Sequence, residues 1–236
     1  ECASRYDLVA IPVVDDQRRL LGVVTIDDIV DVLREEATED ILRMAGAGQM
    51  LVDTRSFVAS FRTRLPWLGA AAAGGLLVAI SLQGFEDALR SVPALALFMP
   101  VVAGMGGNVG TQSSTIVVRG IAVGYVEHTR IGRLVLREVG LGASLGMIYG
   151  IVIALLAPLV GTAGSDPLGL GLVITLGMMG SMIIAAAVGT SVPLILHRLN
   201  IDPAIATGPF VTTAVDILGL LFYFWLATML LASVAG

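Results

Sequence analysis

The chain has 236 residues, of which 56% are hydrophobic and only 14% are charged. A soluble domain carries about 25% charged residues, so this composition indicates an α-helical membrane protein. The net charge of −5 argues against nucleic acid as a partner, and a single cysteine excludes an intrachain disulfide.

Residues 1–40 have the pattern of the C-terminal part of a small α/β domain. Two apolar runs, 8–14 and 20–24, predict strands on either side of a polar turn. Thr25-Ile26-Asp27-Asp28 matches a capping box, which predicts the start of a helix. A unit of about 30 residues is too small to bury a stable core alone. We therefore expect the tail of a larger soluble domain, followed at 41–64 by a connecting helix with a break at Gly46 and Gly48.

Acidic residues are concentrated between positions 27 and 40, where only one arginine accompanies them. A solvated acidic helix is the simpler interpretation. The alternative is a cluster for hard divalent cations, which choose oxygen ligands. The acids concerned are Asp27, Asp28, Asp31, Glu35, Glu36, Glu39 and Asp40.

Five charge-poor segments follow, at about 65–84, 93–118, 139–160, 168–196 and 207–235. Each is long enough to cross a bilayer core, for which roughly 20 helical residues suffice. Arginines gather in the connection 119–138 and recur in 197–202, which the positive-inside rule places in the cytoplasm. We therefore predict five membrane-spanning helices, a cytoplasmic N-terminal region and an extracytoplasmic C-terminus.

The second of these segments is rich in glycine and carries polar side chains. Pro100 and four glycines fall within eleven residues, which predicts an interrupted helix around Asn108. Close helix packing through Gly106-x-x-x-Gly110 is one interpretation. Asn108 and Gln112, together with the acid described next, favour a hydrated ion path instead. In the third segment, Gly142, Gly146 and Gly150 are spaced by four and predict only a packing stripe.

The last segment contains Asp216, the only charged side chain between Pro203 and the C-terminus. A carboxylate at bilayer depth costs roughly 2.5–3.5 kcal/mol on insertion scales, so it marks a functional site. Gly208, Thr212 and Asp216 are spaced by four and share one helix face. No Lys or Arg lies in the segment, so we predict that the partner of Asp216 is a passing cation. One carboxylate cannot satisfy a divalent ion, which favours a two-fold dimer.

Enzymatic functions are poorly supported. No P-loop is present, the glycine-rich run lacks the third glycine of a dinucleotide fingerprint, and we expect Asp216 to be the only carboxylate at membrane depth. A membrane aspartyl protease would need two such carboxylates.

Three motifs together carry a resemblance to the MgtE family of magnesium transporters. Pro100, Gly107, Asn108, Gly110 and Gln112 fit its Pro-x₆-Gly-Asn-x-Gly-x-Gln motif. The second motif consists of Asp202-Pro203-Ala204 together with residues 215–220. The third consists of residues 36–41, which follow a CBS-like run at residues 22–28. The resemblance covers nearly the full chain: the end of a CBS domain (1–40), a plug helix (41–64) and a five-helix pore domain (65–236).

This resemblance implies a homodimeric Mg²⁺-selective channel in the inner (plasma) membrane, in contact with lipid, whose pore is lined by the second and fifth helices. Asp216 matches the aspartate that holds a hydrated Mg²⁺ in the pore. Regulatory Mg²⁺ would bind Asp7, Asp28, Asp31, Glu36, Glu39 and Asp40 and close the channel. The residues expected to line the pore are Gly107, Asn108, Gly110, Gln112, Gly208, Thr212 and Thr213. Some members carry Asn where this chain has Gly208.

Two other functions remain open from the residues alone. One is an ion-coupled divalent cation exchanger that uses the same site. The other is a CBS-linked membrane sensor that does not conduct. Hard oxygen ligands would also accept Mn²⁺, Co²⁺ or Ca²⁺ in place of Mg²⁺.

Overall fold

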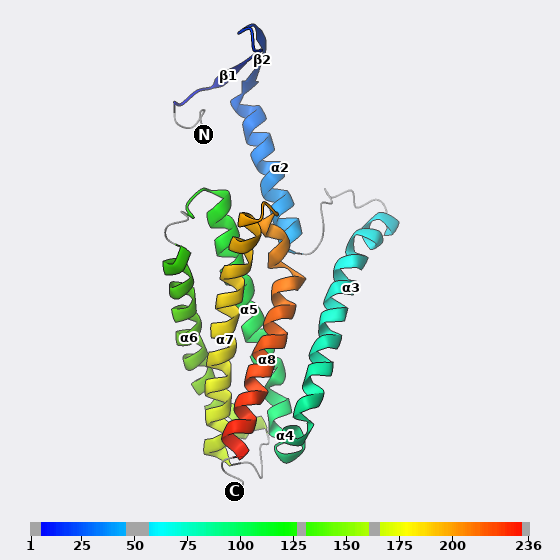
Figure 1. The fold of residues 1–236 in the computed structure, drawn as a ribbon, viewed down its shortest axis with the longest axis vertical. Helices are drawn as coiled ribbons and strands as arrows, with labels where there is room; N and C mark the ends of the chain where they lie inside the picture. The colour runs from blue at the N-terminus through cyan, green and yellow to red at the C-terminus, as the bar shows by residue number, and fades with distance from the viewer. Residues whose placement is uncertain (1–5, 46–56, 127–130, 161–165, 233–236) are drawn as a thin grey trace.

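The computed structural model describes residues 6–45, 57–126, 131–160 and 166–232. A β-hairpin and a long helix project from one end of a bundle of helices (Figure 1). The predicted break at Gly46 and Gly48 lies outside the described residues. The same applies to Cys2, the only cysteine of the chain.

The projecting part consists of strands β1 (Ala10–Val14) and β2 (Leu20–Thr25) and helix α2 (Ile26–Met44). The strands pair antiparallel, with Ala10 opposite Thr25, and both strands lie where the apolar runs predicted them. The capping box is also confirmed, because Asp28 accepts hydrogen bonds from the backbone N–H of Thr25 at 2.9 Å and from its hydroxyl at 2.7 Å. No residue of α2 is buried, as expected for a unit of this size. Helix α2 continues to Met44 without interruption at position 40.

Within the described part of the chain, five helices are long and apolar enough to cross a membrane, in agreement with the predicted number. They are α3 (Phe57–Leu82), α5 (Ala94–Ala122), α6 (Ile131–Leu156), α7 (Pro167–Arg198) and α8 (Pro209–Ala232). The short elements between them are η1 (Gln83–Phe85), α4 (Glu86–Ser91), η3 (Ala157–Val160) and η4 (Pro203–Thr207).

Helix α6 begins earlier than the charge pattern predicted, at Ile131 and not at 139. Its first arginines were expected in a connection, but arginine is a good helix former and continues the helix into the polar layer. Helix α3 (Phe57–Leu82) joins residues 57–64 of the predicted connecting helix to the predicted span 65–84. The added turns of α6 bring Glu138 into the bundle.

Helix α7 is the centre of the bundle, with α5, α6 and α8 packed around it (Figure 1). The α6–α7 contact uses the predicted glycine stripe. A Cβ added at Gly142, Gly146 or Gly150 would lie 2.6, 2.5 or 2.7 Å from backbone atoms of α7. This stripe therefore allows two helix backbones to approach closely, as the spacing indicated.

The predicted interruption of α5 is wrong, because α5 is one continuous α-helix from Ala94 to Ala122. Tertiary contacts explain why glycine is tolerated. A Cβ on Gly106 would lie 2.8 Å from the hydroxyl of Ser181, and one on Gly110 would lie 3.0 Å from Val215. A Cβ on Gly189 of α7 would lie only 2.3 Å from the carbonyl oxygen of Gly110. Packing energy at these positions outweighs the low helix propensity of glycine.

Candidate ion-binding sites

Asp216 lies in the second turn of α8 and is partly buried. Among the residues that the structure describes, its carboxylate has no hydrogen-bond or ion-pair partner. Thr212 precedes it by one helical turn and donates its hydroxyl to the carbonyl of Pro209 at 3.2 Å. The hydroxyl oxygen of Thr212 retains lone pairs, so this face of α8 offers two side-chain oxygen ligands.

Helix α5 presents an open polar face at the same depth. Gly104, Asn108 and Gln112 are spaced by four and exposed, and a Cβ added at Gly104 would meet nothing within 4 Å. Within the described part of the chain, the amides of Asn108 and Gln112 have no hydrogen-bond partner. Val215 packs on Gly106 and Gly110, so the turn of α8 that carries Asp216 lies level with Asn108.

The residues expected to line a pore fall into two groups. Gly107, Asn108, Gln112 and Thr212 remain partly or fully exposed, with open space beside Gly107. Gly110 and Gly208 are buried, and Gly110 packs against α7 and α8. Thr213 faces α3, where a Cβ on Gly74 would come within 2.2 Å of its methyl group. In this structure, Gly110 and Thr213 therefore contribute to helix packing, and Gly208 is buried before the start of α8.

Glu138 is a functional candidate that the sequence analysis missed. It lies in a candidate membrane span, is only 5% exposed, and accepts a hydrogen bond of 3.0 Å from Ser113. The expectation that Asp216 is the only carboxylate at membrane depth stays a prediction, because Glu138 follows Arg137 in the first turns of α6. A signal was present, since Glu138 continues the four-residue spacing of Gly142, Gly146 and Gly150. Its place among the arginines assigned it to a connection instead.

The acidic residues of α2 separate into two sets. Asp28 caps the first turn, where its hydrogen bonds with Thr25 hold the pKa of the carboxyl below its usual value. Asp31 is exposed and lies 4.0 Å from Arg34. Asp7 is also exposed, in the turn before β1, with a positive φ of 50°. These three carboxylates face solvent away from the helix bundle.

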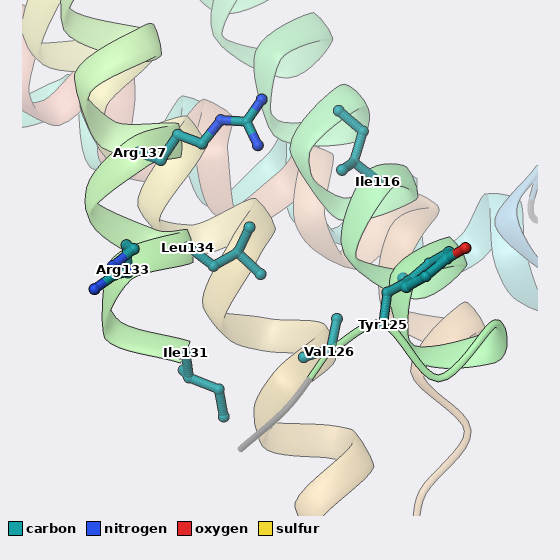
Figure 2. Close-up of a pocket in the computed structure, with 8 residues that line it drawn as sticks. Ile116, Tyr125, Val126, Ile131, Arg133, Leu134 and Arg137 are labelled. Carbon is teal, nitrogen blue, oxygen red and sulfur yellow. The ribbon is translucent and has the colours of Figure 1, made fainter. Parts of the chain in front are cut away.

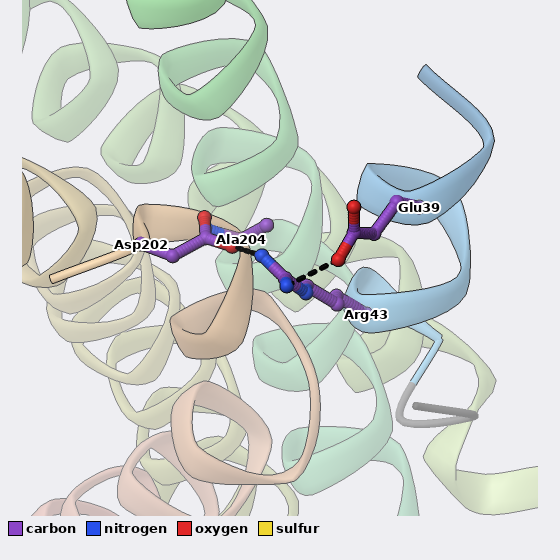
Figure 3. Close-up of polar contacts among 4 residues, drawn as sticks. All are labelled: Glu39, Arg43, Asp202 and Ala204. Carbon is purple, nitrogen blue, oxygen red and sulfur yellow. Dashed lines mark hydrogen bonds and ion pairs between the residues drawn. The ribbon is translucent and has the colours of Figure 1, made fainter. Parts of the chain in front are cut away.

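Glu36, Glu39 and Asp40 instead line a cavity of about 310 Å³ at the junction of α2, α5 and η4. Arg43 of α2 lies in it and forms ion pairs with Glu39 and with Asp202, the residue before η4 (Figure 3). Asp202 also caps η4 by accepting a 2.9 Å hydrogen bond from the N–H of Ala204. Burial raises the pKa of Asp40, the nearby Glu36 and Glu39 add to the rise, and Arg43 opposes it.

The carboxylates around Arg43 do not converge on one point in this conformation. Among the described residues, no group of three or more His, Cys, Asp or Glu side chains is arranged to hold a metal ion. The acidic cavity has ligands of the right chemistry for Mg²⁺. Arg43, however, occupies the position where a bound cation would balance the negative charge of these carboxylates. Any ion bound there must displace or rearrange Arg43.

The fold and these sites define a multi-pass α-helical membrane protein with a charged α/β segment at one end. A family model described as a divalent cation transporter, MgtE, matches residues 99–226, and a CBS domain model matches residues 3–35. The chain therefore belongs to the MgtE family.

Three curated relatives agree with this assignment. The magnesium transporter MgtE of Bacillus subtilis is 43% identical over 231 residues, which are 98% of this chain and 50% of the relative. That of Thermus thermophilus is 37% identical over 233 residues, 97% of this chain and 50% of the relative. That of Enterococcus faecalis is 36% identical over 224 residues, 95% of this chain and 48% of the relative. The chain thus spans about half the length of the curated relatives it matches.

Proposed function

We propose that this chain builds a selective path for Mg²⁺ across the cell membrane, in which Asp216 holds the hydrated ion. The observation that carries the proposal is the Asp216 carboxylate, which has no partner among the described residues and lies in a candidate membrane-spanning helix, level with Asn108. A carboxylate at this depth is costly without a counter-charge, and a transported cation supplies one. The names of the relatives, all magnesium transporters, support Mg²⁺ as that cation.

The path is formed by two copies of the chain. One carboxylate and one hydroxyl are too few ligands for Mg²⁺, which requires six oxygens and gives up its water reluctantly. A two-fold axis beside the open face of α5 places a second Asp216 opposite the first, with water completing the shell. The exposed amides of Asn108 and Gln112 then contact that hydration shell and not the ion.

Regulation acts through α2. Cytosolic Mg²⁺ binds the carboxylates of Glu36, Glu39 and Asp40 and competes with Arg43 for them. Arg43 also pairs with Asp202, at the start of η4, which leads directly into α8. The ion therefore biases the position of the helix that carries Asp216, which gives negative feedback on uptake.

Flux into proteoliposomes tests the transport proposal. We expect Mg²⁺ uptake driven by voltage alone in the unaltered protein, and loss of uptake above background in Asp216→Asn. Asp87→Asn is the matched control, because Asp87 is an exposed acid of α4 outside the proposed path. Absence of Mg²⁺ flux in the unaltered protein would contradict transport and favour the sensor. A strict requirement for Na⁺ or H⁺ would indicate that the protein is an exchanger and not a channel.

Orientation and ion preference are tested in the same vesicles. Cys2 is the only cysteine, so a membrane-impermeant maleimide reports which side of the membrane the N-terminal region occupies. Labelling from the cytoplasmic side is expected, and labelling only from outside contradicts the proposed topology. Mn²⁺, Co²⁺ and Ca²⁺ are tested as competitors of Mg²⁺ uptake. If any of them competes as well as Mg²⁺ itself, the path is not selective for Mg²⁺.

A further inference from the structure

A second cavity lies between the C-terminal end of α5 and the first turns of α6, at the end of the bundle that carries α2 (Figures 1 and 2). Its volume is about 290 Å³. The walls are apolar, whereas two arginines of α6 stand at its edge. The side chains that matter for its chemistry are Ile116, Tyr125, Val126, Leu134, Arg133 and Arg137.

The positive charge in this cavity is not compensated within the described part of the chain. Neither Arg133 nor Arg137 forms an ion pair with a described carboxylate. Glu138 is adjacent in sequence, but its carboxylate is buried and turned to Ser113 of α5. Arg137 extends from α6 across the gap toward Ile116, whereas Arg133 lies on the outer side of α6 (Figure 2). An anion held between α5 and α6 would therefore meet Arg137 first.

The cavity lies at the depth of lipid headgroups. Tyr125 stands at its mouth and is 85% exposed, and a pairing of tyrosine with arginine is typical of the membrane–water interface. From this point, exposed apolar side chains follow the outward face of α6 toward the middle of the membrane. They are Leu141, Leu145, Ile148 and Val152. A molecule bound at Arg137 could thus extend an apolar chain along α6.

We propose that this cavity binds an anionic phospholipid. Arg137 holds the phosphate, Arg133 adds charge from the rim, and the glycerol and upper acyl carbons pack on Ile116 and Leu134. Basic pockets between membrane helices on the cytoplasmic side bind such headgroups. Inorganic phosphate would satisfy the arginines but leave the apolar walls uncovered. The proposal does not depend on Mg²⁺ transport, since it uses no residue of the ion path.

Lipid titration of the full chain in detergent, followed by native mass spectrometry, tests the site. We expect phosphatidylglycerol to bind more tightly than phosphatidylcholine. Replacing both arginines (Arg133→Gln with Arg137→Gln) should weaken phosphatidylglycerol binding about thirtyfold, which corresponds to about 2 kcal/mol. Arg137→Gln alone should account for most of this loss. Arg198→Gln is the control, because Arg198 is an exposed arginine at the same end of the bundle that does not line the cavity.

Four results would overturn the proposal. The first is equal binding of the two lipids. The second is unchanged phosphatidylglycerol binding in the double variant. The third is displacement of the lipid by millimolar inorganic phosphate, which would make the cavity a free-anion site. Both arginines are exposed, so the variants should fold, and helical circular dichroism with size-exclusion chromatography checks this. Cross-linking between copies through Leu134→Cys would show that a second chain fills the cavity and would also refute lipid binding.

Discussion

Gly189→Ala tests whether the close approach of α5 and α7 positions the proposed ion path. The added Cβ would lie 2.3 Å from the carbonyl oxygen of Gly110, and real Cβ contacts essentially never fall below 3.0 Å. The two backbones must therefore separate by about 0.7 Å, because neither contact atom belongs to a flexible side chain. Overpacking of this kind costs about 1–3 kcal/mol. Gly110 is two residues from both Asn108 and Gln112, so the open face of α5 shifts with it.

Gly171→Ala is the matched control, because it adds the same methyl group to the same helix. Its Cβ would make an ordinary contact of 3.7 Å with Ala154. Both variants gain the same helix propensity, so their difference isolates the clash. We expect Gly189→Ala to unfold at a lower temperature in detergent, by about 2–4 °C for each kcal/mol, and to transport less Mg²⁺. Equal melting temperatures and equal flux would refute the packing argument.

Three further predictions concern the two threonines of α8, the ion pair between Arg43 and Asp202, and the N-terminal cap of α2. Thr212→Val should reduce Mg²⁺ flux, whereas Thr213→Val should leave it unchanged, because Thr213 faces α3; equal effects would contradict this assignment. Arg43→Gln and Asp202→Asn, singly and combined, should show a coupling of about 1–3 kcal/mol in a double-mutant unfolding cycle, and additive effects would exclude the ion pair. The pKa of Asp28 is lower in the folded protein than its ordinary value of 3.8. Its carboxylate therefore stabilises the first turn of α2 fully above pH 3.8, and this stabilisation is lost as the pH falls through the lower pKa of the folded state. The protection factor of that turn against hydrogen exchange should be constant between pH 7 and 5 and should decrease below pH 3.8, and a loss of protection that begins at pH 6 would contradict this cause.

The features that depended on local pattern were predicted well. The five apolar segments correspond to five helices in the described part of the chain that can span a bilayer, because length and hydropathy are local properties of the sequence. The capping box at Thr25 and Asp28 and the glycine spacing of α6 were equally local signals. Family membership followed from short motifs, among them the one around Asn108, and the family model confirmed it.

The features that depended on neighbouring helices were not predictable. Glycine lowers helix propensity, but α5 remains helical because Gly106 and Gly110 fit against α7 and α8. The spacing placed Thr212 on the face of Asp216, but it could not show that Thr213 is covered by α3. Glu138 was missed for a related reason: the Ser113 hydroxyl that donates a hydrogen bond to its carboxylate lies 25 residues away. The contact of Arg43 with Asp202 joins segments 159 residues apart and has no local signature.

Ser181 of α7 stands where three helices meet, and its buried hydroxyl has no hydrogen-bond partner among the described residues. A Cβ on Gly106 of α5 would lie 2.8 Å from this oxygen, and a Cβ on Gly219 of α8 would lie 2.5 Å from it. The three positions therefore share one small volume and cannot vary independently during evolution. Replacing Ser181 by alanine removes the oxygen that both added methyl groups would meet. The nearest contacts are then 3.2 Å, with Val215, at position 106 and 3.4 Å, with the Cβ of residue 181, at position 219. The order in which such substitutions accumulate is consequently fixed by sterics, and a descendant with alanine at either glycine should carry the smaller residue at position 181.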